Sequence, residues 1–273
     1  MNTTGLRTKG LRPGFGIEVH NFPLHPTSLN QNARLIEDLV KEYGFLVIRK
    51  TNLTDEIHIA LARHLGDLDD VNPYNKAGNI KADASVVDRK SPSTQAGLDN
   101  ALFHVDSSFN PRRAEHSLLL AHELPPKGTG GNSLEEMKVE LVEKDYIACQ
   151  SILHSKKLAA PEHFADIEPT DNPMGRHKLV QNHEPSGRMN LYLAAHIHHI
   201  ENLAVPDSKA LFERLFEHAT QEKYRVTVEW EDVGDLVVWD NTCTMHRAMG
   251  GEFAHRYRRD MRRATVHDGS SLA

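Results

Sequence analysis

Cysteine is scarce in this 273-residue chain, which has only Cys149 and Cys243, far apart in the sequence. Two distant cysteines provide neither a disulfide framework nor a closely spaced zinc-binding pair, which favours a reducing compartment. Long apolar runs are missing as well. No segment approaches the roughly 20 apolar residues that cross a bilayer, and the basic start of the chain lacks the apolar core of a signal peptide. We therefore expect a cytoplasmic protein without a membrane partner.

The chain also lacks an excess of basic residues. It has 32 Lys and Arg against 38 Asp and Glu, a net charge of −6, which argues against nucleic-acid binding because phosphates must be neutralised by Lys and Arg. No Gly-x-Gly-x-x-Gly motif follows a strand, so no bound nicotinamide or flavin is expected. There is no internal repeat or linker, and we predict one domain spanning residues 1–273. Assembly into a homo-oligomer is left open.

The first part of the chain has the pattern of a small α/β unit. Apolar residues at helical spacing predict a helix over Asn30–Tyr43, and Gly44 gives it a C-terminal stop. Phe45–Ile48 is a short apolar strand. A second helix is expected to begin after Thr54-Asp55 and to end at Gly66.

Beyond about residue 100, short strands alternate with turns. The predicted strands are Leu102–Ser107, Ser117–His122, Lys178–Asn182, Asn190–Ala194, Arg225–Trp230, Asp235–Trp239 and Asp260–His267. Two helices are expected among them, Leu134–Asp145 and Asp207–Ala219. Many short strands in one half of a single domain favour a sandwich or a jelly roll.

The pattern with the clearest chemistry is His104-Val105-Asp106. Residues two apart on a strand share a face, so the imidazole and the carboxylate can converge on one ion. His246, just after the apolar strand that ends near Trp239, is the natural third ligand. Two histidines and one carboxylate form the facial triad of non-haem Fe(II) oxygenases. By itself, a His-x-Asp pair is more often a surface or core pair, so further signals are needed.

The arginine-rich segment Arg256–Val266 supplies a further signal, because it alternates like a strand. If Met261 faces inward, Arg259 and Arg263 do too, while Arg258, Asp260 and Arg262 face solvent. Inward guanidinium groups are costly unless each meets an anion, and their geometry suits carboxylates. The alternative is a basic surface strand or a nucleic-acid patch.

Taken together, these residues resemble one known family, the taurine / 2,4-dichlorophenoxyacetate dioxygenases, which depend on Fe(II) and 2-oxoglutarate. The resemblance covers nearly the whole chain. Its most specific segments occur in order: His104–Phe109, Gly130–Ser133, Gly234–Asn241, His246-Arg247 and Arg259-x-x-x-Arg263-Ala264-Thr265. The resemblance implies a mainly β fold with flanking helices, a double-stranded β-helix or jelly roll.

The resemblance also implies roles for individual residues. His104, Asp106 and His246 would hold Fe(II). Arg259 would pair with the distal carboxylate of 2-oxoglutarate, and Ser133 stands where the family usually has a threonine that supports the same group. With O2 as the oxidant, the products would include succinate and CO2.

On the substrate side, the resemblance implies that Arg263 holds the anionic group, with Asn100 and Asn72 bordering the substrate. A small carboxylate is expected: an aryloxy acid, an organic acid or an amino acid. Acidic and amide residues after Gly66 replace histidines of the taurine enzyme, which argues against a sulfonate. Hydroxylation, desaturation and cyclisation remain open.

Two other functions use the same residues. A zinc hydrolase could activate water with the same three ligands, but it would not need Arg259. A non-catalytic jelly-roll protein could bind iron or 2-oxoglutarate without turnover. The histidine-rich segment Ala195–Ile200 could form a second metal site, although hydrogen bonding is the expected role of its histidines. Cys243 is expected to be a small buried residue.

Overall fold

The computed structural model describes residues 5–69, 75–76, 79–81, 83–87, 102–110, 112–129, 133–138, 146–149, 175–251, 253, 256–270 and 272. For residues 75–76, 133–138 and 146–149 it describes the backbone alone. Within these residues, no helix is long and apolar enough to cross a membrane.

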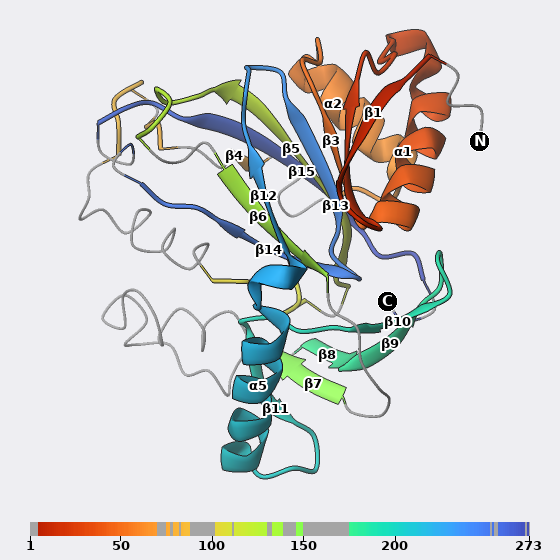
Figure 1. Ribbon diagram of the computed structural model, residues 1–273, viewed down its shortest axis with the longest axis vertical. Coiled ribbons are helices and arrows are strands. Elements are labelled where there is room, and N and C mark those ends of the chain that lie inside the picture. The colour runs from red at the N-terminus through yellow and green to blue at the C-terminus, as the bar shows by residue number, and fades with distance from the viewer. Residues whose placement is uncertain are drawn as a thin grey trace.

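Strands predominate among the described residues, and the three α-helices of that part of the chain pack around them (Figure 1). The helices are α1 (Leu29–Tyr43), α2 (Asp55–Leu65) and α5 (Val205–Ala219), with 3-10 turns η1 (Pro26–Ser28) and η5 (Glu222–Tyr224). The strands are β1 (Arg7–Arg12), β2 (Phe15–His20), β3 (Phe45–Ile48), β4 (Asn75–Lys76), β5 (Ala114–Glu123), β6 (Ser133–Lys138), β7 (Tyr146–Cys149), β8 (Gly175–Lys178), β9 (Val180–His183), β10 (Arg188–Leu191), β11 (Ile197–Ile200), β12 (Arg225–Glu229), β13 (Leu236–Asp240), β14 (Thr244–Ala248) and β15 (Asp260–His267).

The strands form a major sheet and smaller sheets. The major sheet has the order β1-β2-β3-β13-β5-β15-β4, and a second sheet has the order β12-β6-β14. Side chains of both sheets, including Leu119, Val228 and Trp239, pack into one buried cluster between them. The other face of the major sheet is covered by α1 and α2, whose apolar sides form a separate core with it (Figure 1). This arrangement agrees with the predicted jelly roll.

The predicted α/β unit at the start of the chain is confirmed. Helix α1 buries Ile36 and Val40 against the sheet, and Gly44 ends it with a φ of 79°, a conformation that favours glycine. Thr54 caps α2, where its hydroxyl oxygen accepts a hydrogen bond from the backbone N–H of Ile57 at 3.4 Å. The sequence pattern therefore predicted where α1 ends and where α2 begins, each to within one residue.

Among the later elements, the predicted strand Lys178–Asn182 is divided at Leu179 between β8 and β9, and one predicted helix is wrong. The expected helix Leu134–Asp145 is replaced, over the residues described, by strand β6. This strand pairs with β12 on one side and β14 on the other, so backbone pairing with two neighbours outweighs the helical spacing of its side chains. The predicted strand Leu102–Ser107 is also shorter than expected, because His104 makes only an isolated bridge.

Strand β15 alternates as predicted on its inner face. Met261 lies in the core between the sheets, and Arg263 points to the same side. The expectation that the opposite face meets solvent is wrong for Arg262. Helix α2 packs on that face, where Asp55 of α2 accepts a hydrogen bond from Arg262 at 2.7 Å and Asp260 pairs with the same guanidinium. Neighbouring helices thus bury part of a strand face that looks polar in sequence.

Candidate active site

The two predicted histidine ligands are brought together by a backbone bridge. The N–H of His104 donates to the carbonyl of His246 at 2.9 Å, and the reverse bond has the same length. The ring centroids lie 4.4 Å apart. Nδ1 of His104 donates to the carbonyl of Leu102 at 2.7 Å, which leaves the lone pair on Nε2. A ring held in this tautomer is ready to bind a metal.

Asp106 is buried beside the two histidines and held at several points. Oδ2 accepts from the Ser117 hydroxyl at 2.7 Å, and Oδ1 accepts from Nη1 of Arg263 at 2.6 Å. Burial raises the pKa of Asp106, but the opposing effect of Arg263 and the nearby histidines is larger. The pKa of Asp106 therefore lies well below its usual range. The carboxylate therefore stays ionised at neutral pH, as a metal ligand must.

The three side chains offer ligand atoms that all lie within 4.8 Å of one another. Nε2 of His246 is 3.8 Å from Oδ1 of Asp106, close to the roughly 3 Å expected between neighbouring ligand atoms on one ion. Burial and the neighbouring His104 lower the pKa of His246 well below 6.5, so this ring is neutral. Two neutral imidazoles and one carboxylate fit the donor set of a ferrous ion.

A residue without a predicted role, Asn241, organises this cluster. Its Oδ1 accepts from the backbone N–H of Asp106 at 2.9 Å and from the indole N–H of Trp239 at 3.1 Å. Its Nδ2 donates to the Ser117 hydroxyl, which in turn donates to Asp106. The Trp239 ring lies 4.6 Å from the ring of His246. Asn241 thus supports Asp106 through its backbone N–H and through Ser117, and it reaches His246 through the Trp239 ring. In the sequence, Asn241 was marked only as the last residue of the family-like segment Gly234–Asn241.

Replacing Asn241 by Ala is expected to weaken metal affinity about 10- to 100-fold, the usual cost of losing an outer hydrogen-bond partner of a metal ligand. The measurement is anaerobic Fe(II) titration, with thermal unfolding as a check that the variant is folded. Asn190→Ala is the matched control, because Asn190 is also buried and its side-chain amide donates to the carbonyl of Thr242, not to a metal ligand. Equal metal affinity in both variants would contradict this role for Asn241.

The two arginines sit near the cluster in different ways. Arg263 contacts Asp106 directly, and its Nε is buried with no hydrogen-bond partner among the described residues. Arg259 is half-buried, with its guanidinium carbon 5.9 Å from the ring centroid of Phe253. Burial lowers the pKa of Arg259 to about 10, so it remains charged at neutral pH. Both arginines can therefore offer a cation to an acid.

The remaining predicted site residues lie outside what the structure describes. Asn72 and Asn100 are not among the described residues, and for Ser133 only the backbone in β6 is described. The Gly130-Gly131 segment is also outside. Their assignments stay predictions.

The histidine-rich segment approaches the site without forming a second metal cluster among the described residues. Nδ1 of His196 hydrogen-bonds the Ser108 hydroxyl at 2.7 Å, and its ring centroid lies 6.0 Å from that of His104. His198 and His199 hydrogen-bond each other. Sequence spacing alone did not place His196 beside the predicted ligands.

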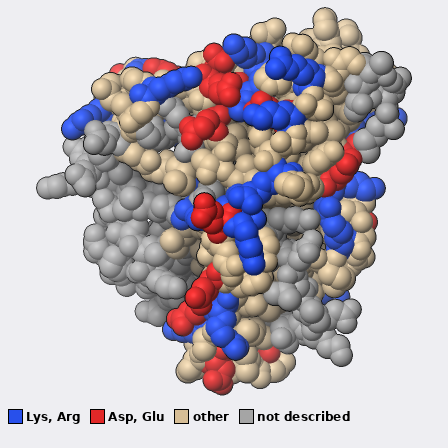
Figure 2. Space-filling model, viewed as in Figure 1, with Lys and Arg blue, Asp and Glu red and all other residues tan. Residues whose placement is uncertain are grey.

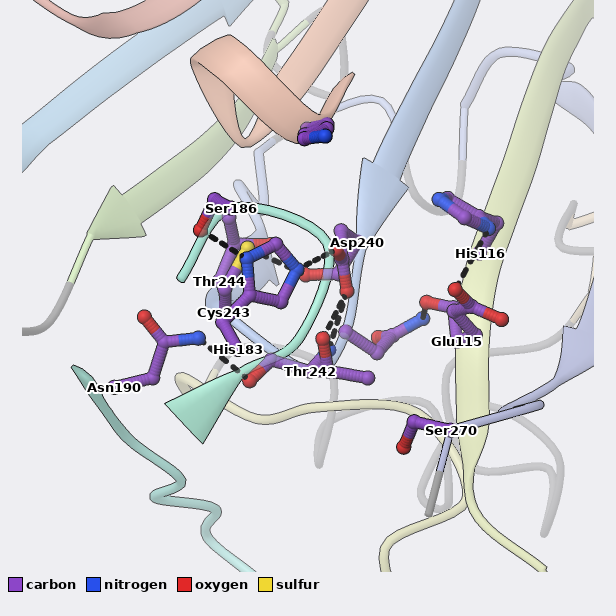
Figure 3. Close-up of polar contacts among 12 residues, drawn as sticks. Glu115, His116, His183, Ser186, Asn190, Asp240, Thr242, Cys243, Thr244 and Ser270 are labelled. Carbon is purple, nitrogen blue, oxygen red and sulfur yellow. Dashed lines mark hydrogen bonds and ion pairs between the residues drawn. The ribbon is translucent and has the colours of Figure 1, made fainter. Parts of the chain in front are cut away.

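A second set of metal-capable groups, His183, Asp240 and Cys243, is satisfied internally. Figure 3 shows the His183 ring between Asp240 and Ser186, with Nε2 donating to Asp240 at 2.8 Å. The other carboxylate oxygen of Asp240 accepts two bonds from Thr242. Because every polar atom of the carboxylate is used, this cluster fixes the turn between β13 and β14. Cys243 is buried there, as predicted.

Comparison with known proteins gives the same assignment over nearly the whole chain. The model of the taurine catabolism dioxygenase TauD, TfdA family matches residues 7–134 and 144–265. An alpha-ketoglutarate-dependent 2,4-dichlorophenoxyacetate dioxygenase of Cupriavidus pinatubonensis is 31% identical over 280 residues, covering 94% of this chain and 96% of that protein. An (S)-phenoxypropionate/alpha-ketoglutarate-dioxygenase of Sphingobium herbicidovorans is 28% identical, covering 76% and 77% of the two chains.

The fold is likewise similar to a solved structure, AAD-2 in complex with Mn(II) and N-oxalylglycine. The TM-score is 0.84 at 28% identity, and the match covers 98% of this chain and 100% of that one. The zinc hydrolase and the non-catalytic binding protein gain no support from these matches. With its family model, its relatives and its His/Asp/His cluster in agreement, this chain belongs to the TauD, TfdA family and is a dioxygenase dependent on Fe(II), 2-oxoglutarate and O2.

Proposed function

We propose that this enzyme oxidises a C–H bond of a small carboxylate substrate of the aryloxy-acid type. The observation that carries the proposal is the guanidinium of Arg263 beside the three-ligand cluster. One of its donors binds Asp106, while the buried Nε has no partner among the described residues. An unsatisfied buried donor of a guanidinium is costly, and a substrate carboxylate would satisfy it. The names of the relatives, which include aryloxy-acid enzymes, support the same substrate class.

In this proposal His104, Asp106 and His246 hold Fe(II), and Arg259 with Ser133 receives the distal carboxylate of 2-oxoglutarate. The bound iron supplies the oxidising chemistry, in which O2 and 2-oxoglutarate are consumed and succinate and CO2 are released. The chain contributes charge and position. Its burial of the ligand cluster keeps water from competing with the substrate.

Arg263 and Arg259 are each assigned one of the two acids that the enzyme binds. Arg263 lies on the face of β15 that carries Met261, and Arg259 directly precedes the strand, four residues before Arg263. The contact of Arg263 with Asp106 places it closest to the reacting centre. We therefore assign the substrate carboxylate to Arg263 and the cosubstrate to Arg259, with Asn72 and Asn100 as bordering residues.

The experiment that tests this proposal measures succinate release from 2-oxoglutarate with single candidate acids. We expect 2,4-dichlorophenoxyacetate or a phenoxypropionate to stimulate release and to be oxidised in equal amount, while taurine does neither. Stimulation by taurine and by no carboxylate would overturn the substrate class.

Replacing Arg263 by Ala is expected to lower kcat/KM for the acid substrate by about 30-fold or more. Losing one charge-assisted contact to a buried group costs about 2 kcal/mol or more. The KM for 2-oxoglutarate should change little. Arg262→Ala is the control, because this arginine lies on the opposite face of the same strand and pairs with Asp55. If 2-oxoglutarate use suffers more than substrate use, the roles of the two arginines are reversed.

The cellular setting is proposed from composition. Two distant cysteines and a net charge of −6 support a cytoplasmic enzyme whose partner is a small molecule, not nucleic acid or a membrane. Its domain organisation is proposed as a single unit over residues 1–273.

A further inference from the structure

The segment directly after Asp106 is a turn with an unusual backbone conformation. Ser107 has a φ of 54°, in the left-handed region that residues other than glycine rarely adopt. The N–H of Asn110 donates to the Ser107 carbonyl at 2.9 Å, and Ser108 between them is fully buried. A backbone held in this region persists only where the surrounding structure fixes it. The groups that fix this turn therefore also fix the end of the segment that carries Asp106.

Strand β8 holds the turn through its buried face. Gly175 and His177 are buried, whereas the two residues of β8 that alternate with them are exposed. Nε2 of His177 donates to the Ser108 carbonyl at 2.9 Å. A Cβ added at Gly175 would lie 2.8 Å from the same carbonyl oxygen, too close for the backbone to stay where it is. Both buried residues of β8 thus contact the carbonyl of Ser108.

The outer face of β8 does not share this role. Arg176 is exposed, and its guanidinium pairs with the Glu201 carboxylate at 2.6 and 2.7 Å. Figure 2 shows exposed charged side chains of both signs over the lower part of the molecule, where Figure 1 places α5 and β11. Exposed ion pairs hold their partners weakly because water competes for the charges. Holding the turn is therefore a property of the buried face of β8.

The ring of His177 is itself fixed from behind. Its centroid lies 5.4 Å from that of Tyr192, edge to face, and the guanidinium carbon of Arg113 lies 4.7 Å from the same Tyr192 ring. Burial and the charge of Arg113 lower the pKa of His177 to about 4, so the ring is neutral at neutral pH. A neutral imidazole has one N–H, and the bond to the Ser108 carbonyl places it on Nε2.

Ser108 connects this support to the active site. Its hydroxyl hydrogen-bonds Nδ1 of His196 at 2.7 Å, and the His196 ring centroid lies 6.0 Å from that of His104. Along the chain, Ser108 is two residues from Asp106. His177 in β8 and His196 next to β11 belong to the two outer strands of the sheet β11-β7-β8 or directly precede them. Ser108 is thus the residue through which this sheet contacts the ligand cluster.

We propose that His177 is a positioning residue for the dioxygenase reaction. Its N–H holds the Ser108 carbonyl, which keeps the Asp106 carboxylate and the His196 ring in fixed places in the site. The inference rests on the proposed role of Asp106 as a metal ligand. The N–H carries this role and not the volume of the ring, because a buried carbonyl needs a donor.

Three variants test the proposal through kinetics. His177→Leu removes the donor, and we expect kcat to fall about tenfold or more, since a misplacement of about 1 Å can cost a hundredfold in rate. The KM for 2-oxoglutarate should stay within about twofold, because Arg259 is untouched. His177→Gln should restore most of kcat, since its amide N–H can take the place of Nε2. Gly175→Ala should lower kcat as His177→Leu does, because its Cβ displaces Ser108.

A second measurement follows the turn in the metal-free protein. Amide hydrogen exchange at Asn110, whose N–H closes the turn, should be about tenfold faster in His177→Leu and near wild type in His177→Gln. The Kd for Fe(II), titrated anaerobically, should rise about tenfold in His177→Leu, as for the loss of an outer support of a ligand. Exchange needs no metal, so it reports on the turn even if the proposed function fails.

His58→Leu is the matched control. His58 is also a buried histidine whose pKa is lowered to about 4, and it hydrogen-bonds the backbone of Leu118. It belongs to α2, which covers the face of the major sheet away from the second sheet. Its loss should lower the thermal stability, while kcat and the exchange at Asn110 remain as in the wild type.

Several results would overturn the role of His177. Wild-type kcat and exchange in a folded His177→Leu variant would do so, as would equal effects of His58→Leu. If His177→Gln is impaired as much as His177→Leu, the donor is not what matters. Should His177→Leu not fold, a wild-type kcat in Gly175→Ala decides against the proposal. Failure of the proposed function appears differently, as normal Fe(II) binding by Asp106→Asn while exchange at Asn110 still responds to His177→Leu.

Discussion

Asp106→Asn is expected to abolish Fe(II)-dependent turnover while leaving the fold intact. The metal affinity should fall by more than about 100-fold, because even an outer partner of a ligand is worth 10- to 100-fold. The variant also removes the carboxylate that accepts from Arg263 at 2.6 Å. Since the Arg263 side chain is 26% exposed, water can solvate part of the released charge, and the loss of stability stays below the roughly 3–5 kcal/mol of a fully buried pair.

Anaerobic titration with Fe(II) and 2-oxoglutarate measures this result through the visible charge-transfer band of the complex. Asp55→Asn is the matched control, because it makes the same exchange at the partner of Arg262, on the opposite face of β15. The control should keep the band at wild-type intensity. A normal band in Asp106→Asn, with the protein folded, would remove Asp106 from the ligand set.

The second large effect is expected for Arg259→Ala, which should raise the KM for 2-oxoglutarate about 30-fold or more. Removing a charge-assisted contact to a carboxylate that stays buried costs about 2–5 kcal/mol. The pKa of Arg259 is about 10, so the side chain is protonated and available below that pH. The measurement is the dependence of succinate release on 2-oxoglutarate concentration.

Arg258→Ala provides the control for this prediction. Arg258 is the preceding residue, is exposed and pairs with Glu123, so its loss should leave the KM for 2-oxoglutarate unchanged. Metal binding measured without cosubstrate should be normal in both variants. An unaltered KM in Arg259→Ala would end the assignment of this residue to the cosubstrate.

Some of this site could be predicted because its chemistry depends on local periodicity. A period of two, as on a strand, predicted that His104 and Asp106 share one side and that Arg259 and Arg263 share another. Helix α1 could be predicted because its apolar spacing and Gly44 agree about where it ends. In each case the information lies within a few residues of the position concerned.

Other features needed contacts between distant parts of the chain. The support of Asp106 by Asn241 joins residues 135 apart, and the hydrogen bond from Asn241 to Ser117 joins the end of β13 to the neighbouring strand β5. The predicted helix Leu134–Asp145 is wrong over its described part, because strand β6 lies between β12 and β14, where paired backbone groups decide its form. The spacing of residues along the sequence does not show which distant strands pair or which distant side chains form hydrogen bonds.

The sequence by itself determined which side chains could bind a metal and two acids, because ligand type and strand alternation are local properties. Only the tertiary structure decided how these groups are held, with Arg263 bonded to the Asp106 carboxylate and Asn241 to the Asp106 backbone. The physical reason is that hydrogen bonds and packing act over a few ångströms in space, whatever the separation along the chain.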